Sequence, residues 1–321
     1  MGKAFWHKLL PCVGVVLLAV IVGRVGPGNI VRAFGGLRPW PLLALPVLMF
    51  AMLAVQTLKW RLLLRGADVR VGFWTLLRLN LLGIFYGTIT PGRVGTLLKV
   101  RYLAEHCGRP VDELSSSVVL DKLIELIVLG GFATGAAVMV AEHLGARALF
   151  FVVAVTLAFA GAGFVFYHRP TAQFVLGRLM FAVVPRSRHE GLRDRVDRVY
   201  AGMPAAMPLA LAVGLSLVSW VLIWTQTYTI AVALSMDIPY GLFIVLIPIG
   251  SLASLIPVSV SGIGTRELAL VPLLAAFGVA PEKTVTMSLL ALLLCVFVPA
   301  ILGATQTRHF ARAAGSNPAA E

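Results

Sequence analysis

Charged residues are scarce in this chain of 321 residues: Asp, Glu, Lys and Arg together make up 13% of it, whereas 59% of its residues are hydrophobic. A soluble globular domain carries roughly 25% charged residues, so the composition excludes that class and indicates a protein that crosses a membrane several times. Acidic residues are the rarer sign, 14 against 27 Lys and Arg, and the net charge is +13. Because the basic residues are spread between apolar runs, with no patch of basic and aromatic residues, we interpret them as an orientation signal with attraction to the lipid surface and expect no nucleic-acid partner.

Cysteine is also scarce. Cys12, Cys107 and Cys295 are far apart in the sequence, which excludes a disulfide framework and a CxxC metal pair, and the six His residues are scattered along the chain. GxSxG, Walker A, HExxH and dinucleotide-binding motifs are absent. We therefore expect no cofactor, no metal and no enzymatic activity.

Apolar runs long enough to cross about 30 Å of hydrocarbon are present, and they lie near residues 9–25, 40–58, 114–140, 148–167, 207–234 and 284–305. Two further apolar regions, 73–106 and 241–277, are interrupted by Gly and Pro, and each half is too short for a comfortable crossing. The expected fold is an all-α polytopic membrane protein with six full transmembrane helices and two re-entrant helical hairpins.

The basic residues predict the orientation of this single membrane domain, residues 1–321. They concentrate in 59–78, where Lys59 is counted as a loop charge, in 168–206 and after residue 305. If the N- and C-termini are in the cytoplasm, all three basic segments lie on the cytoplasmic side of the cell membrane. The basic connection 24–38 then lies on the outer side. We divide the domain into an N-terminal helix and loop (1–39), repeat one (40–140), a connecting helix and basic cytoplasmic loop (141–206), repeat two (207–305) and a cytoplasmic tail (306–321), the two repeats having inverted topology.

The sequence TITPGRVGTLLK at 88–99 supplies the first interruption. Pro91 and Gly92 end one half-helix, Gly95 allows a tight return, and a second half-helix is expected from about Thr96. A helix N-terminus within the membrane favours an anion, and three cations, Arg93, Lys99 and Arg101, lie close to it in sequence. The alternative is that Arg93 snorkels or pairs with a carboxylate of the protein; charged residues within a membrane are nevertheless functional candidates.

The sequence IPVSVSGIGTRELAL at 256–270 repeats this design. Pro257 is expected to end a half-helix, a polar glycine-rich stretch follows, and Thr265 is expected to cap the next half-helix. Glu267 in its first turn suits the helix dipole, whereas Arg266 does not and needs a carboxylate or a substrate anion as partner. Irregular backbone of this kind within a membrane is tolerated only inside protein or beside a watery cavity.

Two acidic residues in the span 114–140, Asp121 and Glu125, are four positions apart and share a helix face. They would neutralise Arg93 or Arg266 across the repeat interface, or bind a proton or coupling ion. We favour the structural counter-ion.

With these motifs, the chain resembles the lysylphosphatidylglycerol synthase transmembrane-region family of flippase-like membrane proteins. The resemblance rests on residues 80–99, on DKLIEL at 121–126 and on residues 256–279, and it covers about 40–305. It implies a lipid-translocating unit, here without the aminoacyl-transferase domain of the larger family members. The family usually has Gly-Glu where this chain has Gly95-Thr96, so recognition of a cation through that carboxylate is not carried over.

The leading hypothesis is therefore a flippase-like transporter of a phosphate-bearing lipid or lipid-linked intermediate, with an anionic or zwitterionic head group. The alternatives are a membrane-embedded polyprenyl-phosphate or lipid transferase, and a non-transporting partner of a lipid-modifying enzyme that docks on the 168–206 loop. Substrate is expected to bind the polar and glycine positions of the hairpins, Thr90, Gly92, Arg93, Gly95, Lys99, Ser259, Ser261, Gly262, Gly264 and Arg266. Charge balance is expected from Asp121, Glu125 and Glu267.

Overall fold

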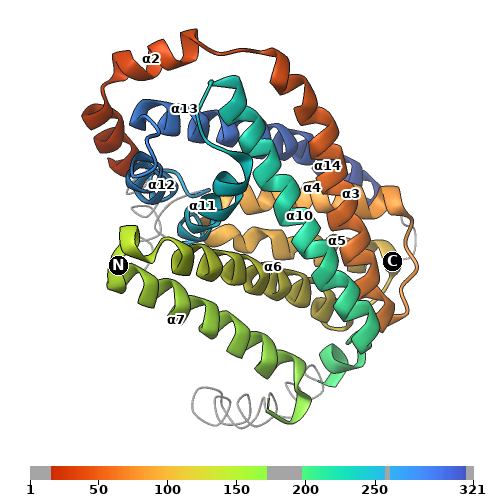
Figure 1. Ribbon diagram of the computed structural model, residues 1–321. Helices are drawn as coiled ribbons and strands as arrows, with labels where there is room; N and C mark the ends of the chain where they lie inside the picture. Colours follow the sequence, from red (N-terminus) through yellow and green to blue (C-terminus); the bar gives the residue numbers. More distant parts are fainter. Residues whose placement is uncertain (1–15, 172–196, 257–260, 316–321) are drawn as a thin grey trace, which may run out of the picture.

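The computed structural model describes residues 16–171, 197–256 and 261–315, and every regular element in those ranges is a helix (Figure 1). The first half contains α2 (Pro27–Gly35), η1 (Trp40–Ala44), α3 (Leu45–Leu63), η2 (Leu64–Ala67), α4 (Phe73–Ile89), η3 (Pro91–Leu98), α5 (Lys99–Cys107), α6 (Val111–Met139) and α7 (Ala141–Tyr167). The second half contains α10 (Ala206–Ala233), α11 (Tyr240–Ala253), α12 (Thr265–Ala275), α13 (Pro281–Ala291), η5 (Leu292–Phe297) and α14 (Val298–Gly315).

Five helical stretches are long and apolar enough to cross a membrane, namely Trp40–Ala67, Val111–Met139, Leu149–Tyr167, Ala206–Ala233 and Pro281–Thr307. They coincide with five of the six full spans predicted from the sequence. The prediction of a multi-pass helical membrane protein is thus confirmed.

The first predicted span, 9–25, differs from the prediction: its described part, residues 16–25, is followed by a sharp bend and does not form a long straight helix by itself. The helix at 16–25 meets α2 at 78°. Gly26 has φ +89° at the junction, and Pro27 begins α2 because its missing N–H group costs nothing in a first turn. The pair makes a sixth candidate span only if the two bent helices are taken together.

The two regions predicted as hairpins contain the short apolar helices α4 and α11. At 1.5 Å per residue, α4 is about 25 Å long and α11 about 21 Å, which is less than a hydrocarbon core. After α4 the chain turns back, since the hydroxyl groups of Tyr86 in α4 and Tyr102 in α5 lie 2.7 Å apart. After α11 it turns back as well, because Leu270 of α12 packs directly against Gly250 of α11.

In both regions the boundaries of the helices around the interruption differ from those predicted from the sequence. η3 is a 3₁₀ helix, so the regular α-helix begins at Lys99 and not near Thr96. α11 ends at Ala253, before Pro257, and residues 257–260 lie outside the described ranges. Local helix breakers therefore locate each interruption, but its extent depends on how the chain packs on return.

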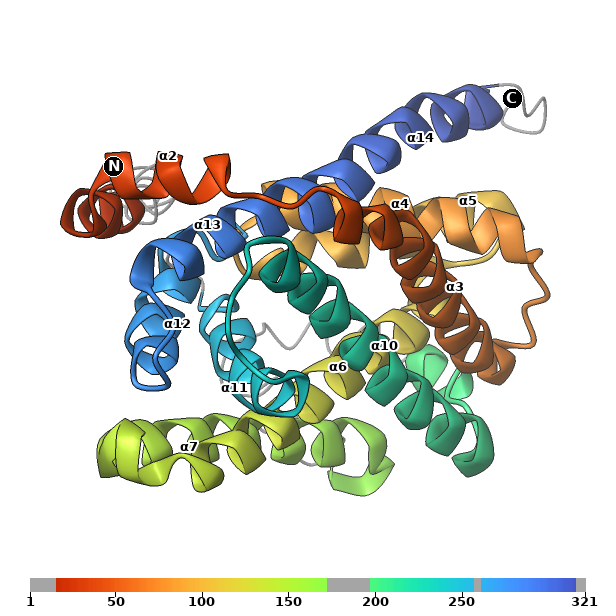
Figure 2. The same ribbon diagram turned by 45° about the horizontal axis from the view of Figure 1, so that its top comes forward.

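The halves pack on each other reciprocally. α3 packs along α10, α4 packs on α14, and α11 packs on α6 (Figures 1 and 2). The contact between α4 and α14 is especially close, because a Cβ atom at Gly303 would lie 2.0 Å from the carbonyl oxygen of Leu81. α7 lies at one edge of the molecule against α6, so the centre is formed by α3, α4, α6 and α10–α14.

Candidate binding cavity between the two halves

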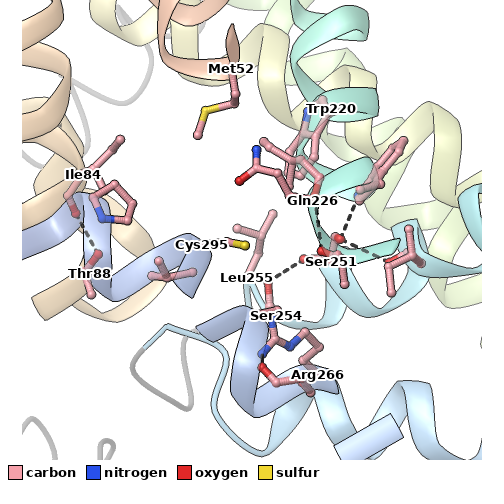
Figure 3. A pocket seen from close by; sticks show the side chains of 18 of the residues that line it. Met52, Ile84, Thr88, Trp220, Gln226, Ser251, Ser254, Leu255, Arg266 and Cys295 are labelled. Carbon is pink, nitrogen blue, oxygen red and sulfur yellow. Dashed lines mark hydrogen bonds between the residues drawn. The ribbon is translucent and has the colours of Figure 1, made fainter. Parts of the chain in front are cut away.

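A cavity of about 160 Å³ lies where the halves meet (Figure 3). Its first-half lining comes from α3, α4 and η3 and consists of Met52, Gln56, Ile84, Gly87, Thr88 and Thr96. The lining from α10, α11 and the two residues after α11 includes Trp220, Trp224, Gln226, Thr227, Ser251, Ser254 and Leu255. The lining from α12 to α14 includes Arg266, Leu270, Ser288, Cys295 and Pro299. Apolar walls with a few polar groups are typical of small-ligand sites.

Arg266 supplies the cation of this cavity. Its Nη2 donates to the backbone carbonyl of Ser288 at 2.5 Å and lies 3.5 Å from the carboxylate of Glu267. Its Nε–H is buried and has no hydrogen-bond partner in the described structure. A guanidinium that is only partly satisfied inside a protein leaves a donor for an anionic ligand.

Glu267 is 2% exposed and holds the start of α12. One carboxylate oxygen accepts from the backbone N–H of Gly264 at 2.7 Å, and the other accepts from the hydroxyl of Ser288. Glu267 therefore caps the helix as its first-turn position suggested, and Thr265, the expected cap, instead donates to the carbonyl of Gly262. The carboxylate balances Arg266 and also joins α12 to α13.

Gln226 is a second polar group that sequence analysis did not select. It lies on α10, is 1% exposed, and its Nε2 has no hydrogen-bond partner among the described residues. Figure 3 shows Gln226 and Arg266 approaching the cavity from different helices. An amide inside an otherwise apolar span was the available signal, because polar residues within a membrane are costly.

In the first interruption, Thr90 and Gly95 form the turn. Thr90 Oγ1 accepts from the backbone N–H of Gly95 at 2.8 Å and donates to the carbonyl of Tyr86 at 2.9 Å. A Cβ atom at position 95 would lie 2.2 Å from that carbonyl oxygen. The predicted tight return at Gly95 is therefore confirmed as local geometry, and the next residue, Thr96, lines the cavity.

The described part of the second interruption, from residue 261 on, has Ser261 (φ +54°), Gly262 (φ +76°) and Gly264 (φ +82°) in the left-handed region. A Cβ atom at position 262 would lie 2.3 Å from that of Ser254, so Gly262 allows this close return. Ser261 donates to the carbonyl of Thr88 in the first half at 3.0 Å. The two interrupted regions thus meet directly beside the cavity.

Three other predicted site residues, Lys99, Asp121 and Glu125, belong to a separate cluster, which is buried except for Glu125, whose side chain is 23% exposed. Asp121 on α6 lies 2.8 Å from Nζ of Lys59 on α3 and 2.7 Å from Nζ of Lys99 on α5. Lys59 also reaches Glu125 at 2.8 Å, and Lys99 reaches Asn80 of α4 at 3.0 Å. We call these five residues the buried ion-pair cluster; it joins four helices of the first half.

The ion-pair partners in this cluster differ from those predicted from the sequence. Asp121 and Glu125 were expected to neutralise Arg93 or Arg266, but they pair with Lys59 and Lys99, and Arg266 is paired with Glu267. Lys99 lies outside the cavity lining and its charge is already matched. Asp121 and Glu125 thus pair within the first half, and their role as structural counter-ions stays a prediction.

Lys59 was misassigned to a loop. It is fully buried near the end of α3, because two carboxylates from α6 compensate a charge that the bilayer alone would not accept. Arg101, the third cation expected at the helix start, is exposed and pairs with Glu105 at 3.0 Å.

Several expected positions fall outside the description. Ser259 lies in 257–260, the side chain of Arg93 is not described, and Gly92 is placed only as part of η3. Most of the basic loop expected to dock an enzyme partner lies in 172–196 and is also outside. Within the described ranges, no three His, Cys, Asp or Glu residues are grouped so that they could hold a metal ion.

Comparison with known proteins agrees with this architecture. A model of the family described as the lysylphosphatidylglycerol synthase TM region matches residues 9–303. Two proteins of Methanothermobacter thermautotrophicus, both described as "UPF0104 membrane protein", are similar over nearly their whole length. One is 24% identical, with 95% of this chain and 96% of the relative covered, and the other is 26% identical, with 92% and 91% covered.

Proposed function

We propose, since this chain belongs to the lysylphosphatidylglycerol synthase transmembrane-region family, that it is a flippase-like transporter of a phosphate-bearing lipid. In this proposal the head group enters the cavity between the halves while the hydrocarbon chains remain in the bilayer. Transport requires no covalent step, so the residues of the cavity bind and release the head group and do not react with it.

The observation that carries the proposal is the cavity itself, together with Arg266. The cavity is lined by helices of both halves, and the buried Nε–H of Arg266 lacks a protein partner. A phosphate offers several acceptor oxygens and a negative charge, which suit a partly satisfied guanidinium. Buried polar groups of a membrane protein that face a cavity mark substrate paths.

The reciprocal packing of the halves supports an alternating mechanism. Each short helix that precedes an interruption packs on the last helix of the other repeat, α4 on α14 of 207–305 and α11 on α6 of 40–140. The helices that precede them, α3 and α10, pack on each other. A pair of inverted repeats related by a two-fold axis has this relation, and such repeats rock about a site at their interface. We place the protein in the cytoplasmic membrane, with both termini in the cytoplasm, because the basic segments concentrate on that side.

The test is lipid translocation in reconstituted vesicles. Purified protein is inserted in vesicles of phosphatidylcholine and phosphatidylglycerol with a trace of fluorescent phosphatidylglycerol, and outward movement is followed by dithionite quenching. Arg266→Gln should slow movement at least about tenfold, because the charged hydrogen bond to the phosphate is lost. Arg101→Gln, on an exposed arginine outside the cavity, is the matched control and should transport normally.

Two results would reject this function. One is wild-type protein that moves the lipid no faster than protein-free vesicles do. The other is Arg266→Gln protein that inserts correctly and transports as fast as Arg101→Gln.

A further inference from the structure

We infer that the cavity selects a lipid whose head group combines a phosphate with an uncharged, hydroxyl-bearing substituent, and that it rejects head groups carrying an ammonium. This inference deepens the proposed function and depends on the same cavity. Phosphatidylglycerol has the favoured chemistry, whereas phosphatidylethanolamine and aminoacylated phosphatidylglycerol have the rejected chemistry.

The charge of the lining is the first argument. Among the described residues that line the cavity, Arg266 is the one with a formal charge. The nearby carboxylate of Glu267 does not line the cavity, is 2% exposed, and is already engaged by the N–H of Gly264, the hydroxyl of Ser288 and the guanidinium of Arg266. An ammonium would therefore enter beside a guanidinium without a carboxylate of its own, and burying an unpaired charge is costly.

The unpartnered donors are the second argument. Gln226 Nε2 and Arg266 Nε are both buried, both belong to residues that line the cavity, and both lack a partner in the described structure. Leaving such N–H groups unsatisfied costs free energy, so the ligand that fits must bring acceptors. A phosphate bound between these two residues would offer acceptor oxygens to both donors, one on α10 and one on α12.

The hydroxyl groups of the lining are the third argument, and they call for the opposite partner. Thr88, Thr227, Ser251 and Ser254 each donate their proton to a backbone carbonyl of the protein. Ser251 also accepts from Nε1 of Trp224 at 3.1 Å, but each of these oxygens keeps a lone pair and has no proton left to give. Hydroxyl protons of a glycerol or sugar substituent can bond to such oxygens without adding a charge.

The tryptophan pair does not provide an alternative site for a cation. Trp220 and Trp224 stack on each other with ring centroids 5.5 Å apart, and Trp224 is 1% exposed and packs edge-on against Phe132 at 4.8 Å. An aromatic cage needs open ring faces. Here the two tryptophan rings cover each other's facing sides, and Phe132 covers a further part of the Trp224 ring.

The substitution Gln226→Glu tests the inference because it changes a buried donor into a carboxylate of the same size. Gln306→Glu on α14, which does not line the cavity, is the matched control. Each protein is purified in detergent, and its thermal stabilisation is measured with phosphatidylglycerol, lysyl-phosphatidylglycerol, phosphatidylethanolamine and soluble glycerol 3-phosphate. Translocation of the three lipids is measured in parallel in vesicles.

Wild type and Gln306→Glu should bind phosphatidylglycerol roughly tenfold more tightly than either ammonium-bearing lipid, and Gln226→Glu should lose or reverse that preference. Equal binding of the three lipids by the wild type, or an unchanged preference in Gln226→Glu, would overturn the inference. Stabilisation by glycerol 3-phosphate equal to that by phosphatidylglycerol would overturn the lipid as the ligand. Selective binding without translocation would uphold this inference and reject the transport proposal, so the two failures are distinguishable.

Discussion

The hydroxyl of Ser261 donates a hydrogen bond of 3.0 Å to the backbone carbonyl of Thr88, although the two residues are 173 positions apart. Thr88 lies in the last turn of α4, immediately before the first interruption, and Ser261 belongs to the second. Thr88 also lines the cavity. The bond therefore joins the two irregular segments at the wall of the proposed binding site.

Two substitutions of Ser261 should separate the contribution of this hydrogen bond to stability from the cost of the left-handed backbone conformation of Ser261. Ser261→Ala loses the bond and keeps φ near +54°, so we expect about 0.5–1.5 kcal/mol of destabilisation. Ser261→Gly also loses the bond but relieves the left-handed conformation, which costs a residue with a Cβ roughly 1 kcal/mol, and should lie closer to wild type. Thermal unfolding in detergent provides the measurement; an alanine variant as stable as wild type would show that the bond contributes nothing.

Asp121→Asn should be among the most damaging single changes outside the cavity. The carboxylate contacts both Lys59 and Lys99, and Lys59 is fully buried. Removing one partner of a buried ion pair typically costs about 3–5 kcal/mol, because the remaining charge is left uncompensated. The control Glu105→Gln breaks an exposed pair with Arg101 and should cost no more than about 1 kcal/mol; comparable melting temperatures for both variants would contradict the prediction.

Gly95→Ala should destabilise the turn at the first interruption by about 1–3 kcal/mol, since its Cβ would lie 2.2 Å from the carbonyl oxygen of Tyr86. Gly131→Ala on α6 meets nothing within 4 Å and should be neutral or stabilising by up to about 1 kcal/mol, as alanine favours the helix. Denaturation midpoints compare the two. A Gly95→Ala protein as stable as Gly131→Ala would mean that the turn yields without cost.

Glu267→Gln should cost about 1–3 kcal/mol, because the amide has one acceptor oxygen for the two donors that the carboxylate now satisfies. Glu282→Gln offers a matched control, as Glu282 also lies in the first turn of a helix, α13. Its loss should cost roughly 0.3–1 kcal/mol through the helix dipole alone. Equal thermal stability of the two variants would remove the argument that Glu267 joins α12 to α13.

The long helices and the positions of the interruptions could be predicted from the sequence. A run of apolar residues must satisfy its backbone within one helix when it lies in lipid, so length and hydropathy were sufficient for five of the six predicted spans. Pro91, Gly95 and Gly264 marked the interruptions because their backbone preferences are local. The 3₁₀ geometry of η3 was not predictable in this way, because it depends on the approach of Gly95 to Tyr86.

The ion pairs could not be predicted, since they are decided by which helices become neighbours. Lys59 stands at the end of an apolar run and looks like the first residue of a basic loop. Only the arrival of α6 beside α3 identifies it as a buried cation. Gln226 had a clearer signal as an amide in an apolar span, but its unpartnered nitrogen is a property of the assembled cavity.

Cys295 gives the chain a built-in chemical reporter. Its thiol belongs to the cavity lining, whereas the other described cysteine, Cys107, does not. With Cys12 and Cys107 replaced, the rate at which a small thiol reagent labels Cys295 would follow how far the cavity opens and whether a head group occupies it. The proposed transport can thus be followed without a probe being engineered into the centre of the protein.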